Sequence, residues 1–160
     1  MENNILIRKG KKSDLPGIFD LIKELAKYEK AENEVSNSIL SMEDDGFGEN
    51  PIYFFFVAES IEKNIIGMAL YYFKYSTWKG RCLFLEDIIV NSEYRGLGIG
   101  KALFQKVIHQ AKNEKVKRLE FQVLNWNQTA IDFYKKFDCN FDDEWINVKL
   151  TEDQILHYQT

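Results

Sequence analysis

The stretch from Leu85 to Ala111 constrains the fold more than any other part of the sequence. An apolar run, Ile88 to Val90, leads through a polar turn into the glycine-rich segment from Arg95 to Gly100. Apolar residues then recur with helical spacing at Ile99, Leu103, Val107 and Ala111. The pattern predicts a strand, a glycine loop and a helix start. Glycines allow close backbone approach, and the first helical amides lack intrahelical acceptors, so this segment is a candidate phosphate site.

The spacing of the glycines excludes two common kinds of phosphate-binding loop. Gly96, Gly98 and Gly100 alternate, whereas a dinucleotide fingerprint requires G-x-G-x-x-G. A P-loop requires Gly-Lys followed by Ser or Thr, but Lys101 is followed by Ala102. Both nucleotide designs are therefore excluded. On these residues alone, a strand–helix turn that binds nothing remains an alternative.

The rest of the chain alternates strand-like and helix-like segments. Strands are expected at 5–8, 52–59, 65–75, 82–90 and 118–123, and helices at about 14–29, 98–114 and 129–136. Ser13 or Asp14 is expected to cap the first helix. The order predicts a βαβ crossover attached to an antiparallel meander, in one domain over residues 1–160.

Three further segments carry weaker local signals. Residues 30–51 are polar and dense in turn residues, which predicts a flexible connector around a short helix at Ser36–Met42. Phe141 and the run Ile146–Leu150 are expected to supply closing strands. Thr151–Gln154 resembles a capping box, which predicts a terminal turn of helix.

Composition excludes several classes of protein. The 160 residues contain no apolar run long enough to span a membrane, and the start lacks a secretory signal, so we expect a cytoplasmic protein without a membrane partner. The formal net charge of −4 argues against nucleic acid and favours a cationic partner. Cys82 and Cys139 show neither disulfide nor metal-ligand spacing, so we expect both to be reduced and no metal to be bound.

The glycine loop resembles the R/Q-x-x-G-x-G/A element of GNAT-superfamily N-acetyltransferases, with Arg95, Gly98 and Gly100 at the defining positions. The resemblance extends to the diamine branch of that family, the spermidine/spermine and thialysine acetyltransferases, at 23–29, 45–48, 71–73, 85–87, 94–100, 126–127 and 133–135. The segment 75–81 is similar to the thialysine enzymes, because Ser76-Thr77 stands where the spermidine/spermine enzymes carry Asp-Pro. The resemblance implies the GNAT α/β fold, a mixed central sheet flanked by helices, with acetyl-CoA as co-substrate and a homodimer.

Acetyl transfer to an amine requires a base and an acid. An alkylamine has a pKa near ~10.4, so a proton must leave before the nitrogen attacks. Glu86, where the central strand approaches the loop, is the candidate base; the alternative is an ordinary carboxylate at a sheet end. Tyr134 matches the family position of the general acid, since a phenol can donate to a departing thiolate; the alternative is a core aromatic residue.

The resemblance also assigns the coenzyme site. It implies that the backbone of Ile88, Ile89 and Val90 pairs with the pantetheine arm. The pyrophosphate is assigned to the loop amides and to the Arg95 charge; these amides belong to Gly96, Leu97, Gly98, Ile99, Gly100 and Lys101. Asn127 resembles a residue that hydrogen-bonds the coenzyme, and its alternative is a plain helix N-cap.

The expected amine groove combines carboxylates with aromatic faces, both of which attract an ammonium group. Its members are Tyr28, Glu29, Trp78, Glu86, Asp87, Glu120 and Trp145, although a strand residue such as Glu120 commonly faces solvent. The leading hypothesis is direct transfer to a small amine, lysine-like or a polyamine. The alternatives are a protein or peptide lysine acetyltransferase and a non-catalytic coenzyme A-binding module, and the sequence does not identify the acceptor.

Overall fold

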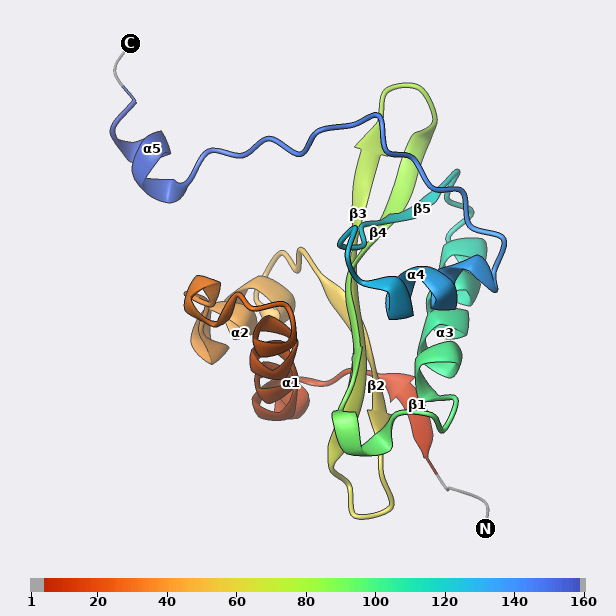
Figure 1. Cartoon of the computed structure of the whole chain (residues 1–160). Helices are drawn as coiled ribbons and strands as arrows, with labels where there is room; N and C mark the ends of the chain where they lie inside the picture. Colours follow the sequence, from red (N-terminus) through yellow and green to blue (C-terminus); the bar gives the residue numbers. More distant parts are fainter. Residues whose placement is uncertain (1–4, 159–160) are drawn as a thin grey trace. The chain divides into compact units, whose positions relative to one another are not determined.

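A computed structural model describes residues 5–158 and divides the chain into two compact units, Met1–Gln122 and Val123–Thr160. The first unit contains the sheet and the glycine loop, and the second begins a few residues before helix α4 (Figure 1). Among the described residues, no helix combines the length and the apolar character needed to cross a membrane.

The first unit is built on a five-stranded sheet in the order β1-β2-β3-β4-β5. The strands are β1 (Leu6–Lys9), β2 (Phe54–Glu59), β3 (Ile65–Ser76), β4 (Gly80–Val90) and β5 (Leu119–Phe121). Neighbouring strands are antiparallel except β4 and β5, which are parallel and joined through helix α3 (Ile99–Asn113). All five expected strands of this unit, the meander and the crossover are confirmed.

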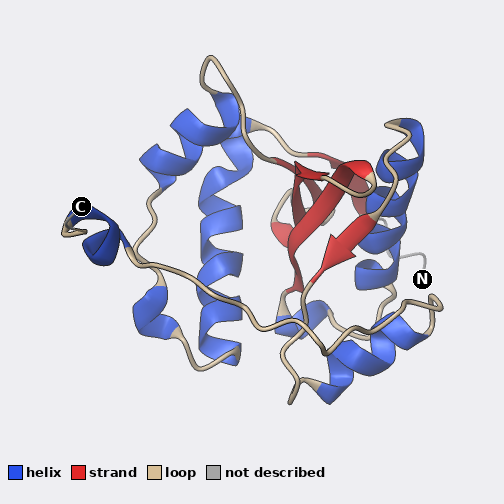
Figure 2. Ribbon diagram, turned by 90° about the horizontal axis from the view of Figure 1, so that it is seen from above, coloured by secondary structure: helices blue, strands red, loops and turns tan. Residues whose placement is uncertain are grey.

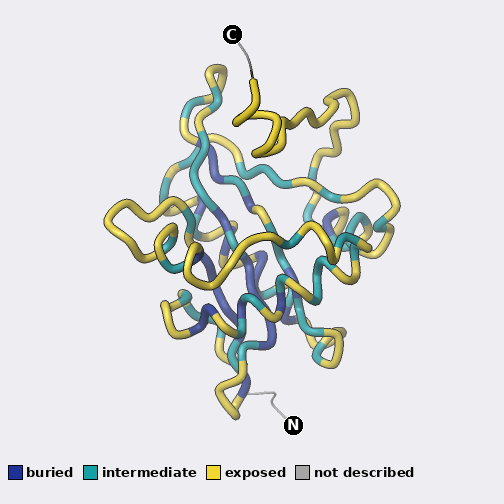
Figure 3. The backbone as a smooth tube through the Cα atoms, turned by 90° about the vertical axis from the view of Figure 1, so that its left-hand side faces the viewer, coloured by how far each residue is buried: buried dark blue, intermediate teal, exposed yellow. Residues whose placement is uncertain are grey.

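Helices cover both faces of the sheet (Figure 2). One face carries α1 (Leu15–Tyr28) and α2 (Ile39–Phe47), and the other carries α3. The core under α1 joins Leu15, Ile18 and Leu21 to Val57, Met68 and Ile89 of the sheet, all at most 5% exposed. Each such side chain contributes roughly 1.5–3 kcal/mol on burial. Figure 3 shows the buried stretches running along the central strands, which makes β4 a fixed base for the loop that follows it.

The start of α1 differs from the expected capping. Asp14 is the N-cap residue, but its side chain makes no capping hydrogen bond. Instead its carboxylate accepts from the Arg8 guanidinium at 2.7 and 2.9 Å and from the Lys11 N–H at 2.7 Å. Burial alone would raise the pKa of Asp14, but these donors hold it below its ordinary value. The 3₁₀ turn Lys12–Asp14 turns the carboxylate toward β1 rather than toward the helix amides.

The connector before β2 is more ordered than its composition suggests. After a 3₁₀ turn at Glu32–Glu34, Ser38 caps α2 by accepting from the Ser41 N–H at 3.1 Å. The helix then continues through Gly46 to Phe47, past the expected end at Met42. Met42 is buried, and the Phe47 ring lies edge-on to Phe55 at 6.0 Å. This packing offsets the low helix propensity of Gly46. The short helix is confirmed at residues 39–42, and the prediction of a flexible connector is wrong for residues 43–47.

The second unit contains α4 (Gln128–Lys135) and α5 (Glu152–Leu156). The capping box before α5 is confirmed, with Thr151 and Gln154 bonded reciprocally at 3.3 and 2.9 Å. The closing strands expected at Phe141 and 146–150 are wrong, because the described part of this unit contains no strand. The alternating residues Ile146, Val148 and Leu150 are 87%, 90% and 63% exposed. A strand pattern forms a strand only where another strand pairs with it.

Candidate functional site

The glycine loop leaves β4 through the 3₁₀ turn Ser92–Tyr94 and ends at the start of α3. Gly96 and Gly98 have φ values of 80° and 78°, in the left-handed region that favours glycine, and a Cβ at either position would meet nothing within 4 Å. Conformation therefore requires these glycines, and the space beside them is open. Gly98 caps α3 without a side chain, so the first helical amides have no capping acceptor. A loop of this shape fits a phosphate group.

The edge of β4 that pairs with β5 loses its partner strand at Glu86. Pairing with β5 covers only Leu83 to Leu85, and no strand in the described part of the chain continues along Glu86–Val90 on that side. On the other side, Leu70 faces Asp87 while Tyr71 faces Leu85, so Glu86 lies at a β-bulge without an opposite residue. The bulge re-aims the Glu86 side chain, and the edge beyond it presents backbone groups to which an extended molecule can pair.

Two carboxylates, those of Glu86 and Glu29, act on a third, Asp87, around this bulge. Burial, together with the negative charges of Glu86 and Glu29, raises the pKa of Asp87 to about 6. Burial also raises the pKa of Glu29, which follows the last residue of α1. The structure therefore brings together three of the residues expected in the amine groove, from β4 and from the end of α1. An ammonium group would offset the repulsion that Glu86 and Glu29 exert on Asp87.

Tyr72 lies near Glu86, which the sequence alone did not indicate. Burial, followed by the charge of nearby Glu86, raises the pKa of Tyr72 to about 12. The phenol therefore stays protonated at neutral pH next to the Glu86 carboxylate. The aromatic run 71–73 gave no sign of this proximity, because it depends on the register of β3 against β4.

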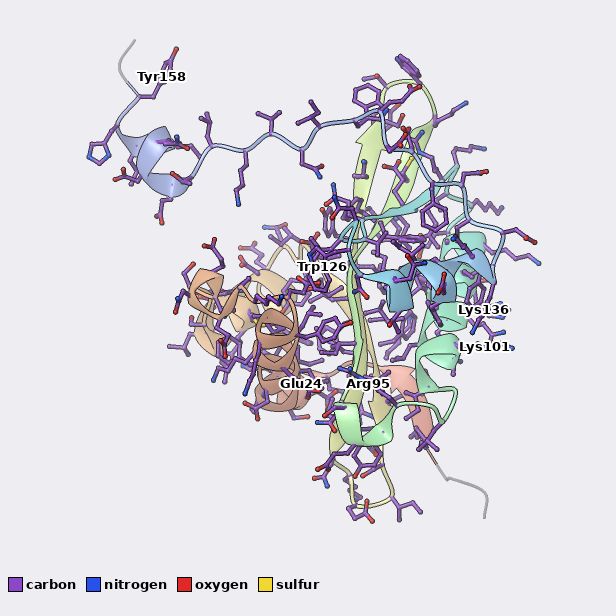
Figure 4. All side chains as sticks on the ribbon, viewed as in Figure 1. Glu24, Arg95, Lys101, Trp126, Lys136 and Tyr158 are labelled. Atoms are coloured by element: carbon purple, nitrogen blue, oxygen red, sulfur yellow. The ribbon has the colours of Figure 1, made fainter. Side chains whose placement is uncertain are left out.

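Arg95 connects the loop to α1. Its Nε donates to the Val90 carbonyl at 3.0 Å, and its Nη2 lies 3.6 Å from a carboxylate oxygen of Glu24. The guanidinium carbon lies 5.4 Å from the centre of the Tyr28 ring. Figure 4 shows Glu24 and Arg95 facing each other where α1 passes the end of β4. The hydrogen bond to Val90 uses one of five guanidinium N–H groups, so donors remain for a phosphate oxygen.

Two other expected groove residues lie elsewhere in the first unit. Glu120 pairs with Lys74 at 2.5 Å and with Arg118. Burial would raise the pKa of Glu120, but these two cations hold it below its ordinary value, so a substrate ammonium would have to displace one of them. Trp78 is 85% exposed in the β3–β4 turn. Six residues of β4 separate Glu86 from the end of that turn, a distance of about 20 Å at strand rise, so one copy of the chain does not bring Trp78 to Glu86.

The second unit carries the remaining expected residues. Asn127 is the N-cap of α4 and accepts from the Ala130 N–H at 3.2 Å, so the N-cap interpretation is confirmed. Tyr134 is 5% exposed and lies two helical turns after Asn127, which places both on one side of α4 about 10 Å apart. Its ring is edge-on to Phe133 at 5.2 Å. Trp145 is 78% exposed.

Comparison with known proteins identifies the family of this arrangement. Residues 18–139 match the acetyltransferase (GNAT) family. The chain is 44% identical over 138 residues to thialysine N-epsilon-acetyltransferase from Bos taurus, covering 82% of this chain and 81% of the relative. It is 32% identical over 159 residues to spermidine/spermine N(1)-acetyltransferase-like protein 1 from Homo sapiens, covering 94% of this chain and 23% of that protein.

Two solved structures share this fold at low sequence identity. An integron cassette protein from the mobile metagenome of V. cholerae superposes with a TM-score of 0.76 at 20% identity, covering 95% of both chains. An aminoglycoside acetyltransferase from an uncultured soil metagenomic sample superposes with a TM-score of 0.76 at 18% identity, covering 94% of this chain and 97% of that chain. These similarities establish the mixed α/β fold.

Proposed function

The chain belongs to the GNAT family of acetyltransferases, and from that premise we propose that it acetylates the primary amine of a small cationic substrate with acetyl-CoA as donor. The arrangement along β4 carries the proposal. Carboxylates gather at the Glu86 bulge. A strand edge that no described strand pairs with follows from Glu86 to Val90, and the open glycine loop comes next. A cation site and a phosphate site thus lie at the two ends of one extended edge.

The first unit supplies most of the proposed coenzyme site, and its glycine loop fits a pyrophosphate. Ile88, Ile89 and Val90 would pair with the pantetheine arm, and the amides from Gly96 to Lys101, with Arg95, would hold the phosphates. Asn127 would hydrogen-bond the coenzyme from the second unit. When bound, acetyl-CoA supplies an acetyl group activated as a thioester.

The proposed chemistry moves two protons. Glu86, exposed and next to the protonated Tyr72 hydroxyl, takes a proton from the substrate ammonium directly or through a water molecule. The amine nitrogen then forms a bond to the acetyl carbon as the carbon–sulfur bond breaks. Tyr134 donates its hydroxyl proton to the sulfur, and the new amide nitrogen gives up its second proton, which restores the Tyr134 hydroxyl. Asp87 and Glu29 hold the cation in place. Transfer is direct, with both substrates bound at once.

A lysine-like amine is the proposed acceptor class. The relative from Bos taurus is a thialysine acetyltransferase, and Ser76-Thr77 leaves the β3–β4 turn without the carboxylate that the spermidine/spermine enzymes carry there. Fewer negative charges suit a short cation better than a long polycation.

We also propose that the two units form one catalytic domain and that the protein is a homodimer. The family match from 18 to 139 crosses the boundary at Gln122, which supports a single domain. The exposed apolar residues Ile146, Val148 and Leu150 form a patch of the kind that a second copy buries. A groove that includes both Trp78 and Glu86 also needs a second copy, given their separation along β4.

An acceptor panel tests the proposed function. The protein is incubated with acetyl-CoA and, separately, with thialysine, lysine, putrescine, spermidine or a lysine-containing peptide. We expect turnover on the lysine-like amines and intersecting initial-rate lines when both substrates are varied. Turnover on the peptide alone would refute the small-amine claim, parallel lines would refute direct transfer, and coenzyme A binding without turnover would indicate a non-catalytic module.

A further inference from the structure

Glu24 lies on α1, outside the glycine loop and the carboxylate cluster, yet it contacts the segment that joins them. Its carboxylate accepts from the Asn91 side-chain amide at 3.0 Å and from the Ser92 backbone N–H at 2.8 Å. A carboxylate oxygen also lies 3.6 Å from Nη2 of Arg95 (Figure 4). One side chain of α1 thus holds both ends of the Asn91–Arg95 turn, which leads from β4 to the glycine loop.

The turn has internal bonds of its own. The Asn91 side-chain oxygen accepts from the Glu93 N–H at 3.1 Å, and the Asn91 carbonyl accepts from the Tyr94 N–H at 2.9 Å. The Asn91 N–H donates to Ile66 at 2.9 Å, which fixes the beginning of the turn to β3. These bonds give the turn its shape, whereas Glu24 fixes its position against α1.

Arg95 lies between two side chains of α1. Tyr28 follows Glu24 by four residues, so the two share one face of the helix. The guanidinium lies 3.6 Å from the Glu24 carboxylate and 5.4 Å from the Tyr28 ring. A flexible side chain next to a phosphate site is thereby held in one region, which lowers the entropy lost when a ligand binds.

We propose that Glu24 is a positioning residue for the coenzyme site: it holds the Asn91–Arg95 turn and the Arg95 guanidinium in the arrangement that binds the pyrophosphate of acetyl-CoA. The inference rests on the proposed function, because it concerns the same coenzyme. It also links the two substrate sites, since α1 ends next to Glu29 of the carboxylate cluster.

Charge and position make opposite predictions for Glu24. A carboxylate that acted only through its charge would repel a phosphate, so its removal would tighten coenzyme binding. A positioning carboxylate has the reverse effect, because its removal frees Arg95 and the turn. The sign of the change in affinity therefore distinguishes the two roles.

The test compares Glu24→Gln and Glu24→Ala with the control Asp20→Asn, which removes the same charge from an exposed site one turn earlier on α1. Calorimetry measures the dissociation constant of coenzyme A. We expect roughly 5-fold weaker binding for Glu24→Gln, on the order of 10-fold or more for Glu24→Ala, and less than 2-fold for the control. In steady-state kinetics, KM for acetyl-CoA should rise while kcat and the amine KM change little.

Hydrogen exchange of the Ser92 amide supplies a readout that needs no ligand. We expect protection in the unchanged protein and faster exchange in Glu24→Ala, with the melting temperature nearly unchanged. Unaltered or tighter coenzyme binding by both Glu24 variants, or an unprotected Ser92 amide in the unchanged protein, would overturn the inference while leaving the proposed function intact. Failure of the unchanged protein to bind coenzyme A would refute the proposed function, and the inference with it.

Discussion

Replacing Asp87 by Asn should stabilise the fold and weaken the function. Asp87 lies beside Glu86 and Glu29, and burial together with these charges raises its pKa from 3.8 to about 6. The folded state therefore binds the Asp87 proton more tightly than the unfolded chain does. Ionised Asp87 destabilises the fold. This contribution is fully present above about pH 6 and shrinks as the pH falls from 6 toward 4. Asparagine has the same shape without the charge, so it removes this cost.

The shift of about two pKa units corresponds to about 3 kcal/mol at pH 8, an upper limit because local relaxation reduces it. At pH 5 the unfolded carboxyl is ionised and the folded one is mostly protonated, so about half of the gain remains. Urea unfolding of Asp87→Asn and the parent protein at both pH values measures the difference. Asp20→Asn, on the exposed side of α1, should show no comparable gain.

The same substitution should raise the amine KM by about 5- to 10-fold, since one of three attracting charges is lost. A stability gain that is equal at both pH values, or a loss of stability at pH 8, would refute the assignment of Asp87 to a strained carboxylate cluster. A gain in stability without any change in amine KM would show that the carboxylate cluster does not bind the amine.

Three other perturbations probe the base, the loop and the proposed dimer. Glu86→Gln should lower kcat by about 10²- to 10⁴-fold with coenzyme A affinity retained, and a kcat close to that of the parent would contradict a catalytic base. Gly98→Ala should lower stability, because a φ of 78° disfavours a side chain, and it should weaken coenzyme A binding by at least about 10-fold, because a Cβ would enter the open space. The control Gly80→Ala, at φ 91° in the β3–β4 hairpin, should lower stability by a similar amount and leave coenzyme A binding unchanged. Val148→Lys, at a site 90% exposed in one copy, should shift sedimentation from dimer to monomer, whereas Lys149→Glu should not. An unchanged dimer in both variants would exclude the apolar patch that contains Val148 from the interface.

Local patterns predicted the part of the fold that contains the loop. The helical spacing after Gly98 and the apolar run before Asn91 each specify one element within a few residues, and the structure has both. The family resemblance is confirmed by the match over residues 18–139. The strand predicted at residues 146–150 is absent. Alternating apolar residues form a strand only where a partner strand pairs with them, and the described part of the second unit contains no strand.

The electrostatics of the carboxylate cluster and the contacts of Glu24 depend on tertiary structure. Glu29 influences Asp87 because α1 ends beside β4, and the bulge at Glu86 follows from the register of β3. No local pattern contains either fact. Glu24 likewise lies within the family-like segment 23–29, but its contacts with Ser92 and Arg95 span most of the first unit. Sequence spacing therefore indicated the glycine loop of the proposed coenzyme site, whereas the electrostatics of the proposed amine site became visible only in the fold.

Direct identification of the product tests the central claim most simply. The protein is incubated with acetyl-CoA and thialysine or lysine, and mass spectrometry follows the amine while a thiol reagent follows coenzyme A. We predict one N-acetylated amine for each thiol released, at a rate that Glu86→Gln strongly reduces. Thiol release without an acetylated amine, or no product from any lysine-like or polyamine acceptor, would contradict the account.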